Sequence, residues 1–170
     1  MNSEPPFTRL RSAVRGDFPA WARFAYFGCL RMDVDSCPIC SHPGRRPAGI
    51  VAELTTAWVT VPIEAPLPGY VCVVAKQHVV EPFELPEDDS AAFWRDCMGA
   101  ARALSTLFQP TKMNYEIHGN TIRHLHMHLY PRYPGDPYEG RPIDSRPHFT
   151  RTPSDIDRIR RAVSDRSIAP

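Results

Sequence analysis

The segment from His124 to Tyr130 alternates histidine with hydrophobic residues, in the order His-Leu-His-Met-His-Leu-Tyr. On a β-strand, successive side chains point to opposite faces of the sheet. The alternation therefore predicts a half-buried strand whose core-facing residues are Leu125, Met127 and Leu129. Three imidazoles would line the opposite face, about 6.5–7 Å apart along the strand: His124, His126 and His128.

The composition limits the class of protein. The chain has 170 residues, 42% of them hydrophobic, which is enough for one domain with a real core. Its 19 prolines argue against a mostly helical protein, because proline lacks a backbone N–H and clashes inside a helix. The net charge is +1, so nothing in the charge balance favours duplex nucleic acid or an anionic membrane as a partner.

Two further observations concern the cellular setting. No hydrophobic run approaches the ~20 residues that a membrane-spanning helix needs, and residues 1–6 do not resemble the start of a signal peptide. The five cysteines are an odd number, whereas a secreted disulfide scaffold normally carries an even set in a shorter chain. We therefore expect a protein of the reducing cytoplasm.

The residue pattern predicts short strands around one long helix. Runs rich in β-branched and aromatic residues, bounded by turn residues, predict strands at 50–54, 58–61, 70–75, 113–118 and 124–130. Proline and acidic residues at 86–89 begin a helix, and Pro110 ends it. Strands, then a helix, then strands with short links indicate an α+β fold with an antiparallel sheet.

Extensions flank the predicted domain at 37–134. Residues 1–36 form an N-terminal extension, in which helical spacing from Phe18 to Tyr26 predicts a short helix. Residues 135–170 form a tail rich in proline and arginine, with helical spacing from Ser154 to Val163. We expect three arginines of this tail to lie on a solvated surface: Arg141, Arg146 and Arg151.

Grouped imidazoles serve two kinds of chemistry, and the residues by themselves leave both open. Imidazoles two positions apart on a strand can reach one ion, which would make an open three-histidine centre of a metal-dependent enzyme. Alternatively, a neutral imidazole can attack phosphorus and form a covalent phosphohistidine that water cleaves, while its neighbours donate to the phosphoryl oxygens. A non-catalytic module would use the triad only to hold the phosphate of a nucleotide.

The sequence resembles the histidine triad family over the whole predicted domain. The alternating segment matches the pattern for which the family is named, and Pro131-Arg132 is typical after it. Residues 67–70 and 76–78 are similar to the family's Pro-Gly strand and its Lys-x-His, and 114–120 are similar to the strand and turn before the triad. The resemblance implies a five-stranded antiparallel sheet with one long helix, and a two-fold homodimer.

For the site, the resemblance implies nucleotidyl chemistry. Members hydrolyse or transfer nucleotidyl groups through the middle histidine, which is His126 here and would attack an α-phosphate. A backbone carbonyl near His124 would accept from one nitrogen of that ring and leave the other nitrogen free. His128 matches the histidine that contacts phosphate. Asn120 stands where the family places a polar side chain that contacts phosphate. Lys76 and Arg132 are further candidates for phosphate contacts, and the alternative for both is a solvated surface.

A branch of the family, which includes galactose-1-phosphate uridylyltransferases, binds zinc through a Cys-x-x-Cys, the Lys-x-His histidine and the first histidine of the triad. The matching positions here are Cys37, Cys40, His78 and His124. The implied Zn²⁺ is structural, with four protein ligands and no open position for water. The other cysteines are expected to be small buried hydrophobes: Cys29, Cys72 and Cys97.

Two positions depart from the family pattern. Tyr70 stands where many members have histidine after Pro-Gly, and Pro62 stands where many have Asp or Asn that binds the ribose hydroxyls. Proline cannot supply that hydrogen bond, and Glu64 is the nearest acidic residue in the sequence. We therefore expect the phosphate chemistry to be kept and the recognition of the nucleoside to differ.

Overall fold

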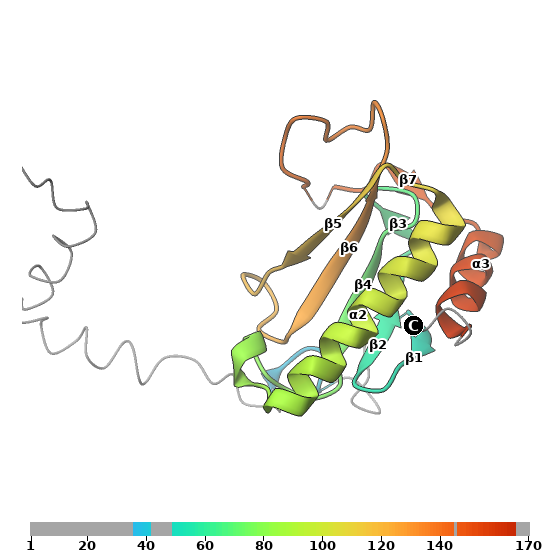
Figure 1. The fold of residues 1–170 in the computed structure, drawn as a ribbon. Helices are drawn as coiled ribbons and strands as arrows, with labels where there is room; N and C mark the ends of the chain where they lie inside the picture. Colours follow the sequence, from blue (N-terminus) through green and yellow to red (C-terminus); the bar gives the residue numbers. More distant parts are fainter. Residues whose placement is uncertain (1–35, 42–48, 145, 166–170) are drawn as a thin grey trace, which may run out of the picture. The chain divides into compact units, whose positions relative to one another are not determined.

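The computed structural model describes residues 36–41, 49–144 and 146–165 (Figure 1). Its main sheet is antiparallel and has five strands in the order β1-β2-β4-β6-β5. The bounds are Ile50–Glu53 for β1, Ala57–Thr60 for β2, Val71–Ala75 for β4, Lys112–Ile117 for β5 and His126–Arg132 for β6. The α+β class with a five-stranded antiparallel sheet is thus confirmed. The helix expected at 18–26 lies outside the described residues.

Helix α2 (Glu87–Phe108) runs along one face of this sheet (Figure 1). Pro86 precedes it, and three acidic residues fill its first turn, where the helix dipole favours negative charge. Gln109 adopts the left-handed conformation and Pro110 follows, so the helix ends where the sequence predicts. A short 3-10 helix, η3 (Pro82–Glu84), leads into α2.

The core lies between α2 and the sheet. The three residues expected to face the core, Leu125, Met127 and Leu129, are at most 1% exposed, and they belong to one core cluster with the buried face of α2. The half-buried strand predicted from the alternation is therefore confirmed, although β6 begins at His126 rather than at His124. Cys97 is fully buried in this core and Cys72 is partly buried, while Cys29 lies outside the described residues.

The C-terminal part of the chain packs on the same core. Helix α3 (Pro153–Ser164) begins at a capping box in which Thr152 accepts from the backbone N–H of Asp155. Its Ile159 and Val163 belong to the core cluster. Upstream of α3, strand β7 (Phe149–Thr150) pairs with β3 (Glu64–Ala65). Two elements of the predicted tail thus help to build the folded unit.

The expectation of a solvated surface is wrong for one of the three arginines of this segment. Arg141 and Arg146 are exposed, but Arg151 is only 4% exposed. Its guanidinium donates to the backbone oxygens of Pro62 and Tyr70, and these two hydrogen bonds compensate part of the cost of burying the charge. The buried arginine therefore connects the segment after β7 to the chain that leads into β4.

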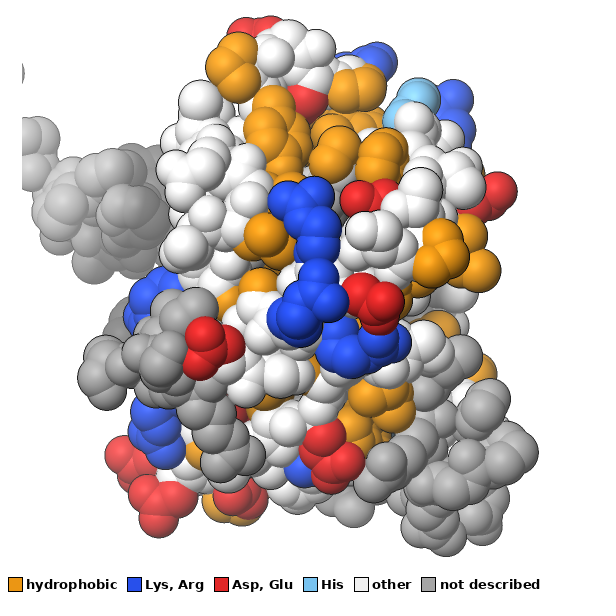
Figure 2. Space-filling model, turned by 90° about the vertical axis from the view of Figure 1, so that its right-hand side faces the viewer, with side chains coloured by type: hydrophobic (Ala, Val, Ile, Leu, Met, Phe, Trp, Pro, Cys, Tyr) orange, Lys and Arg blue, Asp and Glu red, His pale blue; other side chains and the backbone are white. Residues whose placement is uncertain are grey.

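The surface carries both signs of charge. Figure 2 shows the face seen from the α3 side, where Lys and Arg side chains gather near the centre with Asp and Glu side chains among them. This mixture agrees with the balance of 20 basic and 19 acidic residues in the chain. Among the described residues, no helix is both long enough and apolar enough to cross a bilayer.

Candidate functional site

The sheet face opposite α2 carries the second and third histidines of the triad. His126 pairs with Val74 of β4, and His128 lies between Cys72 of β4 and Glu116 of β5. The rings of His126 and His128 meet edge to face, with their centroids 4.9 Å apart. Both side chains are half-buried, so the sheet holds the rings while one side remains open.

The ring of His126 is oriented by the chain itself. Its Nδ1 lies 2.6 Å from the backbone oxygen of His124, and a carbonyl can only accept, so Nδ1 carries the proton. This is the hydrogen bond expected from the sequence. The Nε2 of the neutral ring therefore keeps its lone pair, which is what a nucleophile requires.

His128 is held by a tyrosine from the neighbouring strand. Its Nδ1 lies 2.8 Å from the hydroxyl oxygen of Tyr70, which immediately precedes β4. Burial, together with the neighbouring rings of His126 and His118, lowers the pKa of His128 to about 4. The imidazole is therefore neutral at neutral pH.

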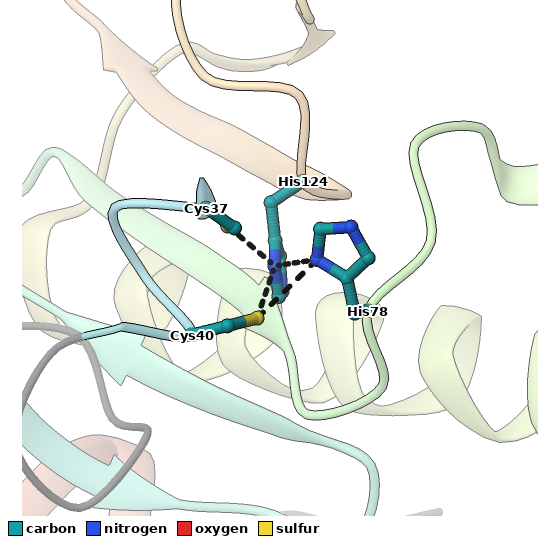
Figure 3. A group of neighbouring side chains, drawn as sticks. All are labelled: Cys37, Cys40, His78 and His124. Carbon is teal, nitrogen blue, oxygen red and sulfur yellow. Dashed lines mark hydrogen bonds between the residues drawn. The ribbon is translucent and has the colours of Figure 1, made fainter. Parts of the chain in front are cut away.

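The Cys-x-x-Cys and two histidines meet at one end of the sheet (Figure 3). Cys37 and Cys40 lie on a turn in which Ser41 donates to the carbonyl of Cys37 through both its N–H and its hydroxyl. His78 follows β4, and His124 precedes β6. The four ligand atoms lie within 4.8 Å of one another, so segments far apart in the sequence converge on one point.

The spacing of these atoms suits a tetrahedral zinc ion. The Nδ1 atoms of His78 and His124 are 3.3 Å apart, and the Sγ of Cys40 lies 3.3 and 3.5 Å from them. The Sγ of Cys37 lies 3.6 Å from the Nδ1 of His124. Zinc bond lengths of about 2.05 Å to nitrogen and 2.3 Å to sulfur give tetrahedral edges of about 3.3–3.6 Å for such pairs. The donor set therefore has the size and chemistry of a closed zinc site.

The ring of His124 is fixed for this purpose by its second nitrogen. Nε2 donates to the backbone oxygen of Ala75 at 2.7 Å, which leaves Nδ1 unprotonated and directed at the cysteines. The side chain is 1% exposed, and burial is the main cause that lowers the pKa of His124. Since both nitrogens of His124 are engaged away from His126 and His128, the three histidines do not form an open metal centre.

The ammonium of Lys76 lies beside the turn between β1 and β2. It donates to the backbone oxygens of Leu54 and Thr55, at 2.7 and 3.3 Å, and pairs with the carboxylate of Glu53 at 3.0 Å. These contacts use the three donors of the ammonium in the turn between β1 and β2. Lys76 therefore supports this turn, and its contact with phosphate stays a prediction.

Arg132 is likewise engaged in the structure of a loop. Its guanidinium binds the carboxylate of Asp136 through two hydrogen bonds of 2.7 and 2.9 Å and donates to the backbone oxygen of Tyr138 at 2.7 Å. The hydrogen bond from Arg132 is the main cause that lowers the pKa of Asp136 to about 2. Arg132 therefore closes the loop after β6 through this ion pair, and its contact with phosphate stays a prediction.

The remaining predicted positions lie in loops and at edges. Asn120 is exposed on the connection from β5 to β6. Pro62 is exposed, and its carbonyl accepts from Arg151, while Glu64 lies in β3 opposite Thr150. The structure therefore gives Pro62 and Glu64 parts in the attachment of the C-terminal segment.

Two further side chains lie beside the triad. The ring of His118 lies 5.6 Å from that of His128, and its Nε2 lies 3.0 Å from the carboxylate of Glu116. Tyr70 was noted only as a departure from the family pattern. The position of His118 could be found from the sequence, because Glu116 and His118 are two residues apart and therefore lie on one face of an extended chain. No local pattern indicates that Tyr70 reaches His128.

Comparisons with known proteins agree with this fold. A HIT-like protein from Methanocaldococcus jannaschii is 28% identical over 97 residues, which are 55% of this chain and 75% of the relative. A histidine triad protein from Bradyrhizobium japonicum has a similar structure, with a TM-score of 0.61 and 24% identity over 68% of this chain and 87% of its own. A zinc-bound histidine triad family protein from Mycobacterium smegmatis has a TM-score of 0.57 and 23% identity, covering 81% of this chain and 100% of its own. The HIT domain family model matches residues 44–135, more than half of the sequence, and the chain therefore belongs to the HIT domain family.

Proposed function

We propose that the chain is a nucleotide hydrolase or nucleotidyltransferase in which His126 carries the nucleotidyl group during turnover. Proteins of the HIT domain family generally bind nucleotides, and many hydrolyse or transfer them. The observation that carries the proposal is the 2.6 Å hydrogen bond from Nδ1 of His126 to the backbone oxygen of His124. It leaves Nε2 unprotonated on the open face of the sheet, as nucleophilic attack requires.

In the proposed reaction, Nε2 of His126 attacks the α-phosphorus of the substrate. A P–N bond forms, and the bond between the α-phosphorus and the oxygen or nitrogen of the leaving group breaks. The leaving group departs with the bonding electron pair and takes up a proton from solvent. In the second step, the oxygen of water or of another acceptor attacks the same phosphorus and loses its proton to solvent. The P–N bond breaks, its electron pair returns to Nε2, and His126 is again neutral with its proton on Nδ1.

His128 supports this chemistry by its position. Its ring meets that of His126 at a centroid distance of 4.9 Å, on the same face of β6. An N–H of this ring would donate to a non-bridging oxygen of the phosphoryl group, where negative charge increases as the nucleophile attacks. Asn120 is assigned a polar contact with the phosphate from the family pattern.

We also propose that the four-residue Cys/His cluster holds a structural Zn²⁺. The residues are Cys37, Cys40, His78 and His124, and their spacing and orientation support the assignment. The zinc-bound relative from Mycobacterium smegmatis adds to it. When bound, the ion would supply cross-links between the Cys-x-x-Cys turn and the sheet, with no position open for a substrate.

The substrate class follows from the phosphate chemistry and remains broad. Dinucleoside polyphosphates, nucleoside phosphoramidates and nucleotidylated small molecules all present an α-phosphate with a leaving group. Pro62 cannot bind ribose hydroxyls as Asp or Asn would, so recognition of the nucleoside falls to other residues. We further propose a cytoplasmic homodimer whose catalytic domain spans 37–134.

The test combines a substrate screen with trapping of the intermediate. Members of the three substrate classes are incubated with the protein, released nucleoside monophosphate is measured, and the protein is analysed by mass spectrometry after rapid quenching. We expect turnover and a nucleotidyl mass increase on His126. His126→Ala should abolish both, whereas His148→Ala, a change at an exposed histidine outside the triad, should retain them.

Two results would contradict the proposal. Full activity of His126→Ala would exclude the covalent mechanism. Binding of nucleotides without any product over hours would instead favour the non-catalytic nucleotide-binding module. Circular dichroism of both variants shows whether the fold is retained.

A further inference from the structure

Tyr70 connects the strand before the site to the ring of His128. Its hydroxyl oxygen lies 2.8 Å from Nδ1 of His128, although the two residues are 58 positions apart in the sequence. Tyr70 is 8% exposed and His128 is half-buried, so water competes little for this hydrogen bond. The hydrogen bond between Tyr70 and His128 is therefore a fixed feature of this face of the sheet.

The direction of the hydrogen bond follows from the partners. A buried hydroxyl must donate its proton, and among the described residues the Nδ1 of His128 is the acceptor that Tyr70 has. Burial also raises the pKa of Tyr70, so the hydroxyl keeps its proton at any ordinary pH. Nδ1 of His128 is thus the acceptor, and in the neutral ring the proton must be on Nε2.

This tautomer is the opposite of the one found in His126. In His126 the chain holds the proton on Nδ1 and leaves Nε2 as a lone pair. In His128 the hydroxyl of Tyr70 donates to Nδ1, so the proton of the neutral ring is on Nε2 and that nitrogen is a donor. A nucleophile and a hydrogen-bond donor for the phosphoryl group therefore stand side by side, with ring centroids 4.9 Å apart.

Tyr70 itself is fixed by two further contacts. Its ring stacks on that of Tyr130, with centroids 4.8 Å apart and an angle of 21° between the planes. Its backbone oxygen accepts from the buried guanidinium of Arg151, which comes from the segment before α3. The ring and the backbone of Tyr70 are therefore each held by a neighbouring residue, and together they place the hydroxyl. The C-terminal segment contributes to this placement through Arg151.

We propose that Tyr70 is a positioning residue that holds His128 in the Nε2–H tautomer, so that this nitrogen donates to the phosphoryl group of the substrate. The inference rests on the proposed function for its catalytic consequence, but the tautomer itself is a property of the free protein.

The first experiment measures the tautomer directly. The purified full-length protein with its metal is labelled with ¹⁵N-histidine, and long-range ¹H–¹⁵N spectra are recorded near pH 7, with His128→Gln used for assignment. We expect the signals of His128 to show a protonated Nε2. In Tyr70→Phe, the ring should become a mixture of both tautomers, whereas Tyr130→Phe should leave it unchanged.

The second experiment measures the catalytic consequence on the best substrate of the screen. We expect Tyr70→Phe to lower kcat about 10- to 100-fold and to change KM by no more than about twofold. Without the tyrosine hydroxyl, His128 donates less often to the phosphoryl group, and that hydrogen bond acts mainly in the transition state. Tyr70→His, which restores an N–H donor, should recover much of kcat. Tyr130→Phe removes the same atom from the stacked neighbour and should keep kcat within about twofold of the unchanged protein.

Each outcome bears on one claim. An Nε2–H ring in Tyr70→Phe would overturn the positioning role, even if the rate fell. A change of tautomer with an unchanged kcat would overturn its catalytic relevance. If the unchanged protein turned over no substrate while His128 showed the Tyr70-dependent tautomer, the proposed function would fail and the structural assignment would stand.

Discussion

The backbone oxygen of His124 lies 2.6 Å from Nδ1 of His126, while the side chain of His124 belongs to the cluster with Cys37 and Cys40. One residue therefore takes part in both sites, through its carbonyl in one and its imidazole in the other. A displacement of the His124 backbone would move both the imidazole and the carbonyl that orients the nucleophile, because both are attached to one Cα.

The first prediction concerns loss of the metal. Cys40→Ser, or incubation with a strong chelator, should lower the free energy of unfolding by about 4 kcal/mol, the scale of losing a structural metal. The rate constant for turnover should fall as well, because the carbonyl of His124 is no longer held. Zinc content, chemical unfolding and kcat measure the three effects.

Cys97→Ala is the matched control for this experiment. Cys97 is buried in the core and lies outside the cluster, so this variant should retain one zinc per chain and its activity. A Cys40→Ser protein with full zinc content and unchanged stability would show that the four residues do not form a metal site.

The second prediction separates stability from substrate binding at Lys76. Lys76→Met removes the donor to Leu54 and the charge that pairs with Glu53, so the free energy of unfolding should fall by about 1 kcal/mol. KM for the nucleotide substrate should stay unchanged, since the ammonium is occupied in the turn between β1 and β2. An increase of KM by tenfold or more, without a change in the free energy of unfolding, would instead show that Lys76 contacts the phosphate.

The third prediction is a dependence of stability on pH at Asp136. Arg132 holds the pKa of this carboxyl at about 2, below the ordinary value of 3.8. A lowered carboxyl pKa stabilises the fold above the unfolded pKa, and this contribution is lost as the pH falls from about 4 to about 2. Asp136→Asn should therefore cost about 2 kcal/mol at pH 7 and progressively less below pH 4.

Urea unfolding of both proteins at several pH values between 7 and 3 measures this difference. The exposed pair of Asp144 and Arg146 offers a comparison, because solvent screens it, and Asp144→Asn should have a smaller effect. A cost of Asp136→Asn that stays constant over the whole pH range would rule out the ion pair as its source.

The fourth prediction compares two glycines. Gly69 has a φ of +76°, and a Cβ there would lie 2.8 Å from the ring of Phe108 and 2.9 Å from Pro131. Gly69→Ala should destabilise the protein by about 1–3 kcal/mol, because both the backbone and the packing must change. In helix α2, a Cβ at Gly99 would meet nothing within 4 Å, so Gly99→Ala should raise stability by about 0.5–1 kcal/mol.

Thermal and urea unfolding of the two glycine variants give the sign of each change. Equal effects at both positions would contradict the prediction, since of these two glycines Gly69 alone combines a left-handed backbone with close neighbours.

Local patterns were sufficient for the elements that place the site. The alternation at 124–130 predicts which face of β6 is buried, because the two-residue period of a strand leaves no other arrangement. The start and end of α2 follow from proline and acidic residues near Pro86 and from Pro110. Strands β3 and β7 were missed, since two residues each are too short for a period and each needs the other to form.

Spacing along the chain was enough to identify the strand that carries the histidines and the helix that covers its other face, and the resemblance to a known family paired the Cys-x-x-Cys with two histidines. Spacing can be counted in a sequence without any knowledge of the fold. The partners of Lys76, Arg132, Arg151 and Tyr70 could not be found in this way, since each side chain had several partners to choose from. Folding selected among them, because it brought Tyr70 to His128 and Arg151 to Pro62 across 58 and 89 positions of the chain and placed acceptors beside Lys76 and Arg132.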